Sequence, residues 1–263
     1  ESENIQSLYF FGILKLYGIS VPKDERIAAN TFRRAGELGH PEAATALGTM
    51  LMTGMGVKKD YSAAVAAFRL GIALEDNNAL WLLGKLLLEG PSPIIEASDD
   101  EKAEAVYLCH VGASNHIPQA EHLLATMYEY GMGVVQDYPT AMHYYQRAAE
   151  QKYIESMYHL SLMYSYGRGC LQDYKRAFSL LELAARENHA PSCYYLGVFK
   201  MYGYGCEPNY EQAFNWFEIA RGLDDFRISA KAGEAAIELK LLMDEAALQN
   251  DKILQQFQER STD

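Results

Sequence analysis

A Gly-x-Gly tripeptide that recurs at a nearly fixed interval constrains this chain more than any other feature. A fixed period of a few tens of residues is typical of proteins that stack one supersecondary unit many times. Only the step from Gly90 to Gly131 exceeds 36 residues, and Pro91, Pro93, Ser98, Asp99 and Asp100 cluster there, which predicts a lengthened loop. The tripeptides are Gly54-Met55-Gly56, Gly131-Met132-Gly133, Gly167-Arg168-Gly169 and Gly203-Tyr204-Gly205, and the 36-residue step also reaches Gly18 and Gly90.

Each unit has the pattern of two amphipathic helices. Apolar residues recur every four positions on both sides of the glycine turn, which predicts two helical stripes. Asp60 stands where the second helix would begin, and its carboxylate can accept hydrogen bonds from the free N–H groups of the first turn. Asp137, Asp173 and Asn209 hold the same position in later units. The stripes of the second unit are Ala43, Leu47 and Leu51, then Ala64, Phe68 and Ile72.

A small residue recurs inside the first helix of every unit. Glycine within a helix costs about 1 kcal/mol relative to alanine, so its repeated use predicts that a neighbouring helix packs too closely for a larger side chain. The residues are Gly12, Gly48, Gly84, Ala125, Ser161 and Gly197.

These patterns predict a single all-α solenoid domain over residues 1–263. Its repeats are expected at about 5–40, 41–76, 77–116, 117–153, 154–189 and 190–225. Residues 226–263 keep Ala232-Gly233 at the repeat position but lose the Gly-x-Gly turn, and they continue with Ile253, Leu254 and Phe257. A divergent terminal unit is typical of a cap, so this segment is expected to be a degenerate capping unit.

The motif of Leu-Gly, an aromatic or aliphatic residue, Gly-x-Gly, Asp-Tyr and spaced alanines resembles the Sel-1-like repeat. The most faithful copies run from Leu124 to Ala149 and from Leu160 to Ala185, whereas the unit from Gly84 to Ala113 lacks both Gly-x-Gly and Asp-Tyr. Members of that family are similar to tetratricopeptide solenoids. The resemblance implies a right-handed α-α superhelix that serves as an adaptor or scaffold for protein complexes.

The charge balance restricts the class of partner. Lys and Arg total 23 against 35 Asp and Glu, which gives a formal net charge of -12 and disfavours nucleic acid. A basic or amphipathic protein or peptide fits better, although plain solubility also accounts for the charge. The most apolar stretch, Leu80 to Leu88, is too short for a membrane span and contains Lys85.

No pattern in the sequence indicates catalysis. The aspartates before the second helices are explained as caps, and Asn209 in the same position could not act as a general acid or base. The glycine pairs lack the context of a phosphate loop, and the histidines and cysteines lack metal-ligand spacing. We therefore expect no enzyme activity, cofactor or metal; an unusual site in the loop from Pro91 to Asp100 is the remaining enzyme alternative.

Two rows of residues on the first helices are expected to line a concave groove, if the units stack as in tetratricopeptide arrays. The first row lies two residues before the Leu of each Leu-Gly: Tyr9, Thr45, Trp81, His122, Tyr158 and Tyr194. The second row lies six residues after it: Tyr17, Thr53, Glu89, Tyr130, Tyr166 and Tyr202. Glu42, Glu129 and Glu155 flank the rows, so the groove is expected to be acidic and lined with rings that can hold a cation. The alternative is that the tyrosines fill space between adjacent helices. The predicted partner-binding residues are Tyr9, Tyr17, Trp81, His122, Glu129, Tyr130, Tyr158, Tyr166, Tyr194 and Tyr202.

A second functional hypothesis is a regulatory subunit of a membrane-associated or lumenal degradation complex, like the Sel-1-like component of such machinery. The sequence has no Asn-x-Ser/Thr sequon, which favours an intracellular address, either cytoplasmic or organellar. The chain begins at Glu1 without Met, which indicates a trimmed fragment from which a targeting peptide could have been removed.

Overall fold

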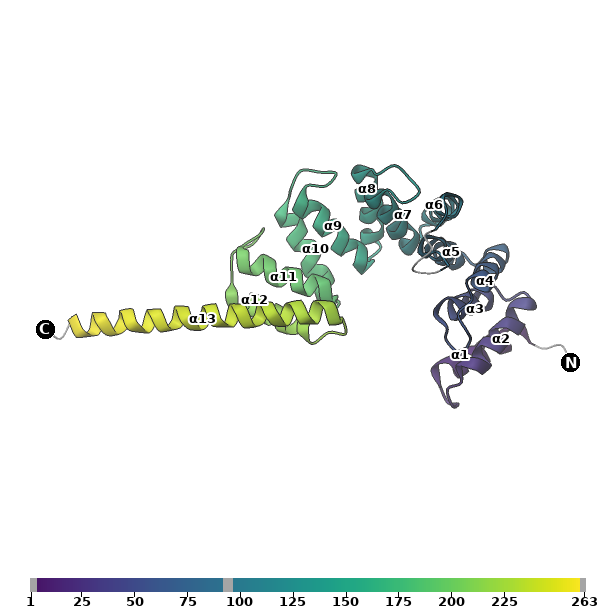
Figure 1. Cartoon of the computed structure of the whole chain (residues 1–263), viewed down its shortest axis with the longest axis horizontal. Helices are drawn as coiled ribbons and strands as arrows, with labels where there is room; N and C mark the ends of the chain where they lie inside the picture. The colour runs from purple at the N-terminus through teal and green to yellow at the C-terminus, as the bar shows by residue number, and fades with distance from the viewer. Residues whose placement is uncertain (1–3, 92–96, 261–263) are drawn as a thin grey trace. The chain divides into compact units, whose positions relative to one another are not determined.

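The computed structural model describes residues 4–91 and 97–260, and every regular element in them is an α-helix (Figure 1). Helices α1 to α12 form six pairs, in which an odd-numbered first helix is followed by an even-numbered second helix. The pairs are α1 (Ile5–Tyr17) and α2 (Glu25–Glu37), α3 (Pro41–Thr53) and α4 (Tyr61–Ala73), α5 (Asn78–Glu89) and α6 (Asp99–Ser114), α7 (Pro118–Tyr130) and α8 (Tyr138–Glu150), α9 (Ile154–Tyr166) and α10 (Tyr174–Arg186), and α11 (Ala190–Tyr202) and α12 (Tyr210–Arg221), with α13 (Phe226–Arg260) at the end.

The chain divides into two compact units, Glu1–Ala148 and Ala149–Asp263, which we call unit 1 and unit 2. Consecutive helices pack against each other in unit 1 from α1 to α7 and in unit 2 from α9 to α13. First helices also contact the first helices of the next pairs, as α3 does α5 and α5 does α7. This arrangement confirms the predicted fold class, an all-α solenoid of helix pairs. One continuous domain over residues 1–263 stays a prediction.

The turn within each pair is held by local hydrogen bonds. In the second repeat Gly54 has a left-handed φ of 82°, and the N–H groups of Gly54 and Met55 both donate to the carbonyl of Met50, at 2.8 and 3.1 Å. Asp60 then accepts from Ala63 N–H at 2.9 Å with Oδ1 and starts α4. Asp173 and Asn209 accept in the same way from Arg176 and Gln212. The predicted caps are confirmed at these three positions.

The recurring glycine of the first helix lies against a buried ring of the second helix. A Cβ added to Gly48 would lie 2.7 Å from the ring of Phe68, and the corresponding distances are 2.5 Å from Gly12 to Phe32 and 2.6 Å from Gly197 to Phe217. The three phenylalanines are among the most completely buried side chains. The predicted close packing is confirmed, and its partner is a ring within the same repeat.

The second glycine of the Gly-x-Gly turn makes the contact between successive repeats. A Cβ at Gly56 would lie 2.4 Å from the carbonyl oxygen of Glu25, in the first turn of the previous second helix. The same distance is 2.9 Å from Gly133 to Lys102 and 2.2 Å from Gly205 to Tyr174. Only a residue without a side chain allows this approach, and the nearest atom in each case belongs to the backbone.

The third repeat departs from this scheme. Gly90 ends α5 with φ 69° and ψ 176°, unlike the left-handed caps of the other first helices. Ser98 caps α6 in a capping box with Glu101, so Asp99 and Asp100 form the first helical turn. The expectation that these two aspartates belong to a lengthened loop is therefore wrong, because Ser98 starts the helix before them. Pro93 lies outside the described residues.

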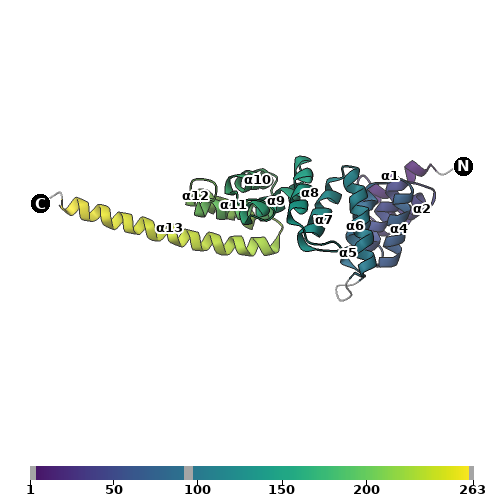
Figure 2. The same cartoon turned by 90° about the horizontal axis from the view of Figure 1, so that it is seen from above.

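The terminal segment is one 35-residue helix, α13, in place of a helix pair. Ala236 and Leu239 pack with Ala213 and Phe217 of α12, so the first part of α13 covers the last repeat. Figures 1 and 2 both show α13 extending beyond α12. The side chains of Ile253, Leu254 and Phe257 lie outside the described residues. None of the described helices has the length and apolar character needed to cross a bilayer.

Candidate partner-binding surface

The first row is half-buried in unit 1, where its rings pack inside the repeats. Tyr9 stacks on His40, with ring centroids 4.3 Å apart and an interplanar angle of 22°, and it also contacts Phe32 at 5.9 Å. The His122 ring lies 5.4 Å from that of Tyr145. Thr45 is buried and Trp81 is half-buried. Tyr9 and His122 therefore contribute to packing between the two helices of a pair.

The first row of unit 2 also packs against other rings. The ring of Tyr158 lies 5.3 Å from His189 and 5.7 Å from Tyr195, and that of Tyr194 lies 5.7 Å from Phe217. Burial, with smaller contributions from Tyr195 and other nearby groups, raises the pKa of Tyr194. The Tyr194 hydroxyl therefore stays neutral at physiological pH, and the charge of this surface comes from other groups.

The second row is exposed. In unit 1 the exposed fraction is 67% for Tyr17 and 57% for Tyr130, and in unit 2 it is 60% for Tyr166 and 61% for Tyr202. Each of these tyrosines is the last residue of its first helix, directly before the glycine turn. Thr53 and Glu89 are exposed at the same position. The structure thus separates the two predicted rows into packing residues and surface residues.

An aromatic extension of the second row in unit 2 was not predicted. Tyr204, the middle residue of a Gly-x-Gly turn, stacks on Tyr202 at 5.7 Å and on Tyr174 at 4.8 Å, with interplanar angles of 28° and 15°. The signal in the sequence was the single aromatic residue among the four middle positions of the turns. Its neighbour Tyr174 belongs to the previous repeat, so the contact depends on the tertiary fold.

An arginine of the chain itself lies over one of the exposed rings. The guanidinium carbon of Arg168 is 5.4 Å from the centroid of Tyr166. A cation over the face of an aromatic ring is attracted by the quadrupole of the ring. The second row therefore includes a ring that holds a guanidinium group.

The flanking carboxylates differ in accessibility. The side chain of Glu42 is 54% exposed and lies 3.2 Å from Nδ1 of His40, and Glu155 is also exposed. Glu129 is only 4% exposed, and the Tyr145 hydroxyl donates to its Oε2 at 2.8 Å. The expectation that Glu129 flanks the surface is wrong, because its carboxylate is used in the core of the fourth repeat.

The ionisable groups of the core are structural. Glu121 is fully buried and its Oε1 is 2.6 Å from the guanidinium of Arg147, which also donates to the carbonyl of Ala113. Burial raises the pKa of Cys109 to about 12 and that of Cys193 to about 11, so both thiols are protonated and poorly nucleophilic at neutral pH. Within the described residues, no group of three or more His, Cys, Asp or Glu side chains is placed to hold a metal ion.

Comparison with known proteins identifies the repeat. The Sel1 repeat model matches residues 5–40, 41–70, 77–110, 118–153, 154–189 and 190–225. No curated protein sequence matches the chain.

Among solved structures, a Sel1 repeat protein from Oxalobacter formigenes is similar at 25% identity with a TM-score of 0.74, over 84% of this chain and 87% of that protein. A putative Sel1 repeat protein from Klebsiella pneumoniae is 20% identical with a TM-score of 0.54, over 81% of this chain and 99% of the other. An immunity protein from Pseudomonas aeruginosa is 18% identical with a TM-score of 0.52, over 90% and 83%. The Klebsiella and Pseudomonas proteins share the fold of this chain. With six matched repeats over most of its length, the chain belongs to the Sel1 repeat family, whose solenoids are generally non-catalytic scaffolds for protein–protein interaction.

Proposed function

We propose that this protein is an adaptor in which each of the two units binds a segment of another protein through its second-row tyrosines. The supporting observation is their exposure: four tyrosines at one repeat position are 57–67% exposed, although tyrosine rings are usually more buried. Tyrosine supplies a large contact area at a low conformational cost and is enriched among the residues that dominate binding energy. Each unit therefore carries two exposed tyrosine anchors at the same repeat position.

The chemistry of the surface favours a basic or amphipathic partner. The net charge of -12 attracts basic segments, and the exposed rings can hold cations over their faces. The contact between Arg168 and Tyr166 is an internal example of that recognition. A partner arginine would take the same position over Tyr17, Tyr130 or Tyr202.

Substitution of the second row tests the proposal. We expect Tyr166→Ala with Tyr202→Ala, and Tyr17→Ala with Tyr130→Ala, each to abolish capture of part of the set of partners that the wild-type protein retains from its native source. The matched control is Tyr107→Ala with Tyr210→Ala, because these tyrosines are 67% and 56% exposed but lie on second helices. Equal loss of capture in the control pair, or none in the second-row pairs, would contradict the proposal.

Selection from a displayed library of random peptides tests the partner chemistry. We expect the retained peptides to be enriched in Arg and Lys, and the enrichment to disappear when selection uses the second-row variants. Enrichment in Asp and Glu would show that the charge of the surface has been misjudged. We also expect peptide binding to weaken as the salt concentration rises, because salt screens exposed charges.

The adaptor role requires that more than one partner be held. Unit 1 and unit 2 each carry two exposed second-row tyrosines, so each can be impaired separately. We expect the Tyr17/Tyr130 variant and the Tyr166/Tyr202 variant to lose different partners in cross-linking mass spectrometry. Loss of one common partner in both variants would contradict separate binding by the two units.

A further inference from the structure

The departure of the third repeat leaves a pocket in unit 1. In the second, fourth and sixth repeats the second glycine of the turn lies against the first turn of the preceding second helix, as Gly56 does against Glu25. The third repeat has Gly90-Pro91-Ser92 in place of Gly-x-Gly. Its counterpart surface is the start of α4 at Tyr61, and there the structure has a pocket of about 460 Å³.

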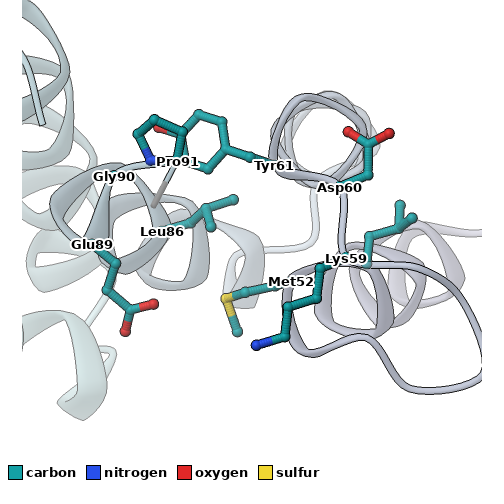
Figure 3. A pocket seen from close by; sticks show the side chains of 9 residues that line it. Met52, Lys59, Asp60, Tyr61, Leu86, Glu89, Gly90 and Pro91 are labelled. Atoms are coloured by element: carbon teal, nitrogen blue, oxygen red, sulfur yellow. The ribbon is translucent and has the colours of Figure 1, made fainter. Parts of the chain in front are cut away.

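The pocket lies between the ends of two first helices and the start of α4 (Figure 3). Met52 and Leu86 extend into it from α3 and α5, and Tyr61 and Pro91 close one side. Glu89 lies on the α5 side and Lys59 on the α3 side. The full lining is Leu51, Met52, Lys59, Asp60, Tyr61, Leu86, Glu89, Gly90 and Pro91.

Two of the polar groups in the lining are already engaged. Asp60 caps α4 through Ala63 N–H at 2.9 Å, and the Tyr61 hydroxyl donates to Glu101 at 2.8 Å. Among the described residues, the ion pair of Glu89 is a long one with Lys85, 3.8 Å between atoms whose side chains are 54% and 47% exposed. Such an exposed pair contributes little, so the Glu89 carboxylate can exchange it for another cation.

The electrostatics of the pocket differ between its two sides. Glu89 is the last residue of α5, where the helix dipole adds negative potential to that of the carboxylate. On the other side the methylenes of Lys59 lie over Gly54, at the end of α3. The α5 side is therefore suited to a cation, whereas Lys59 repels one.

We infer that this pocket binds an arginine or lysine side chain of the partner segment, with the methylene stem on Met52 and Leu86 and the charged group at Glu89. This inference rests on the proposed function, because it takes the bound side chain to belong to a protein partner. Glu89 belongs to the second row, so a segment that follows the row passes over the pocket. Long cationic side chains pack an apolar stem and keep the charged end at the rim, which matches an apolar floor beside a carboxylate.

Nuclear magnetic resonance with a small probe tests the pocket without any partner protein. The protein is labelled with ¹³C-methyl methionine, and the Met52 signal is identified by its absence in Met52→Leu. The probes are N-acetyl-arginine amide, N-acetyl-norleucine amide and N-acetyl-glutamate amide. We expect the arginine probe to change the chemical shift of the Met52 methyl group in a saturable way. The norleucine probe should change it less, and the glutamate probe should not change it.

Two charge variants are expected to change the affinity for the arginine probe in opposite directions. Glu89→Gln should weaken binding of the arginine probe by about threefold, the size of one exposed ion pair, and Lys59→Gln should strengthen it by a similar factor. Glu37→Gln is the matched control, because Glu37 is also an exposed last residue of a helix in unit 1. It should leave binding unchanged.

The inference is overturned if the arginine probe gives no saturable change in the Met52 chemical shift, if Glu37→Gln weakens binding as much as Glu89→Gln does, or if the glutamate probe binds and depends on Lys59. These outcomes are independent of the tyrosine variants. Failure of partner capture by the second row would refute the proposed function but leave the probe result in place. Absence of probe binding with intact partner capture would refute the pocket alone.

Discussion

The contact between Gly197 and Phe217 provides a quantitative test of the packing within a repeat. A methyl group added by Gly197→Ala would lie 2.6 Å from Cε1 and 2.7 Å from Cδ1 of Phe217. Carbon atoms in contact are normally separated by roughly 3.5 Å or more, so the ring must move by about 1 Å. Phe217 is only 1% exposed, and such a movement displaces its neighbours in α12 and α13 as well.

Two opposing effects determine the size of the change. Overpacking of a buried core costs about 1–3 kcal/mol, and a contact this short belongs in the upper part of that range. Alanine is a better helix former than glycine by about 1 kcal/mol, which offsets part of the cost. We therefore expect Gly197→Ala to lower the free energy of unfolding by about 1–2 kcal/mol.

Urea denaturation followed by tryptophan fluorescence measures this change in unit 2. The chain has two tryptophans, and Trp216 is adjacent to Phe217 in α12. A Trp81→Phe background leaves Trp216 as the single reporter. Far-ultraviolet circular dichroism of the same samples tests whether the helices unfold in the same transition.

A compensating substitution separates overpacking from other causes. Repeat five has Ser161 where repeat six has Gly197, and Leu181 where repeat six has Phe217. Phe217→Leu should cost about 1 kcal/mol alone. The double variant should be more stable than the sum of the two single changes predicts, by a coupling energy of about 1 kcal/mol or more. Additivity within about 0.4 kcal/mol would refute the steric explanation.

Three further predictions concern buried ionisable groups. Arg147→Met leaves the fully buried Glu121 without its cation and should lower the free energy of unfolding by about 3 kcal/mol or more in urea denaturation; a loss below about 1 kcal/mol would contradict this. Tyr145→Phe removes the donor to Glu129 and should cost about 1–3 kcal/mol by the same assay, whereas an unchanged midpoint would show that the hydrogen bond is dispensable. Burial raises the pKa of Cys109 to about 12, so its contribution to stability is complete below the unfolded thiol pKa of about 8.5 and is lost as the pH rises toward 12. Cys109→Ala should therefore flatten the fall in thermal midpoint between about pH 9 and 12, and an unchanged slope would refute the assignment.

Local features of the fold were predictable because they depend on short stretches of chain. Asp60 was assigned as a cap from its position before an apolar stripe, and the interaction needs only the N–H three residues ahead. The recurrence of Gly48 and its counterparts indicated a close approach. The identity of the approaching ring required the second helix of the pair to be placed against the first.

The candidate surface was predicted only in part, because the exposure of a ring depends on distant residues. Tyr9 and Tyr17 both lie on α1 and belong to the two predicted rows, yet Tyr9 is covered by His40, the cap residue of α3. The prediction that Glu129 lies at the surface is wrong for a related reason. Tyr145 stands where repeat six has Phe217, and a buried tyrosine hydroxyl requires a hydrogen-bond partner. That substitution was the available sign that a nearby acid is used internally.

The two kinds of glycine contact have a consequence for how such a protein changes in length. The fit of Gly197 to Phe217 lies wholly inside one helical hairpin, and the join made by Gly205 meets the backbone of the preceding hairpin. A duplicated hairpin would therefore bring both halves of its own fit with it, and its second glycine would need only the backbone of the neighbouring hairpin. The two glycine contacts therefore place no demand on the side chains of a neighbour when a hairpin is gained or lost.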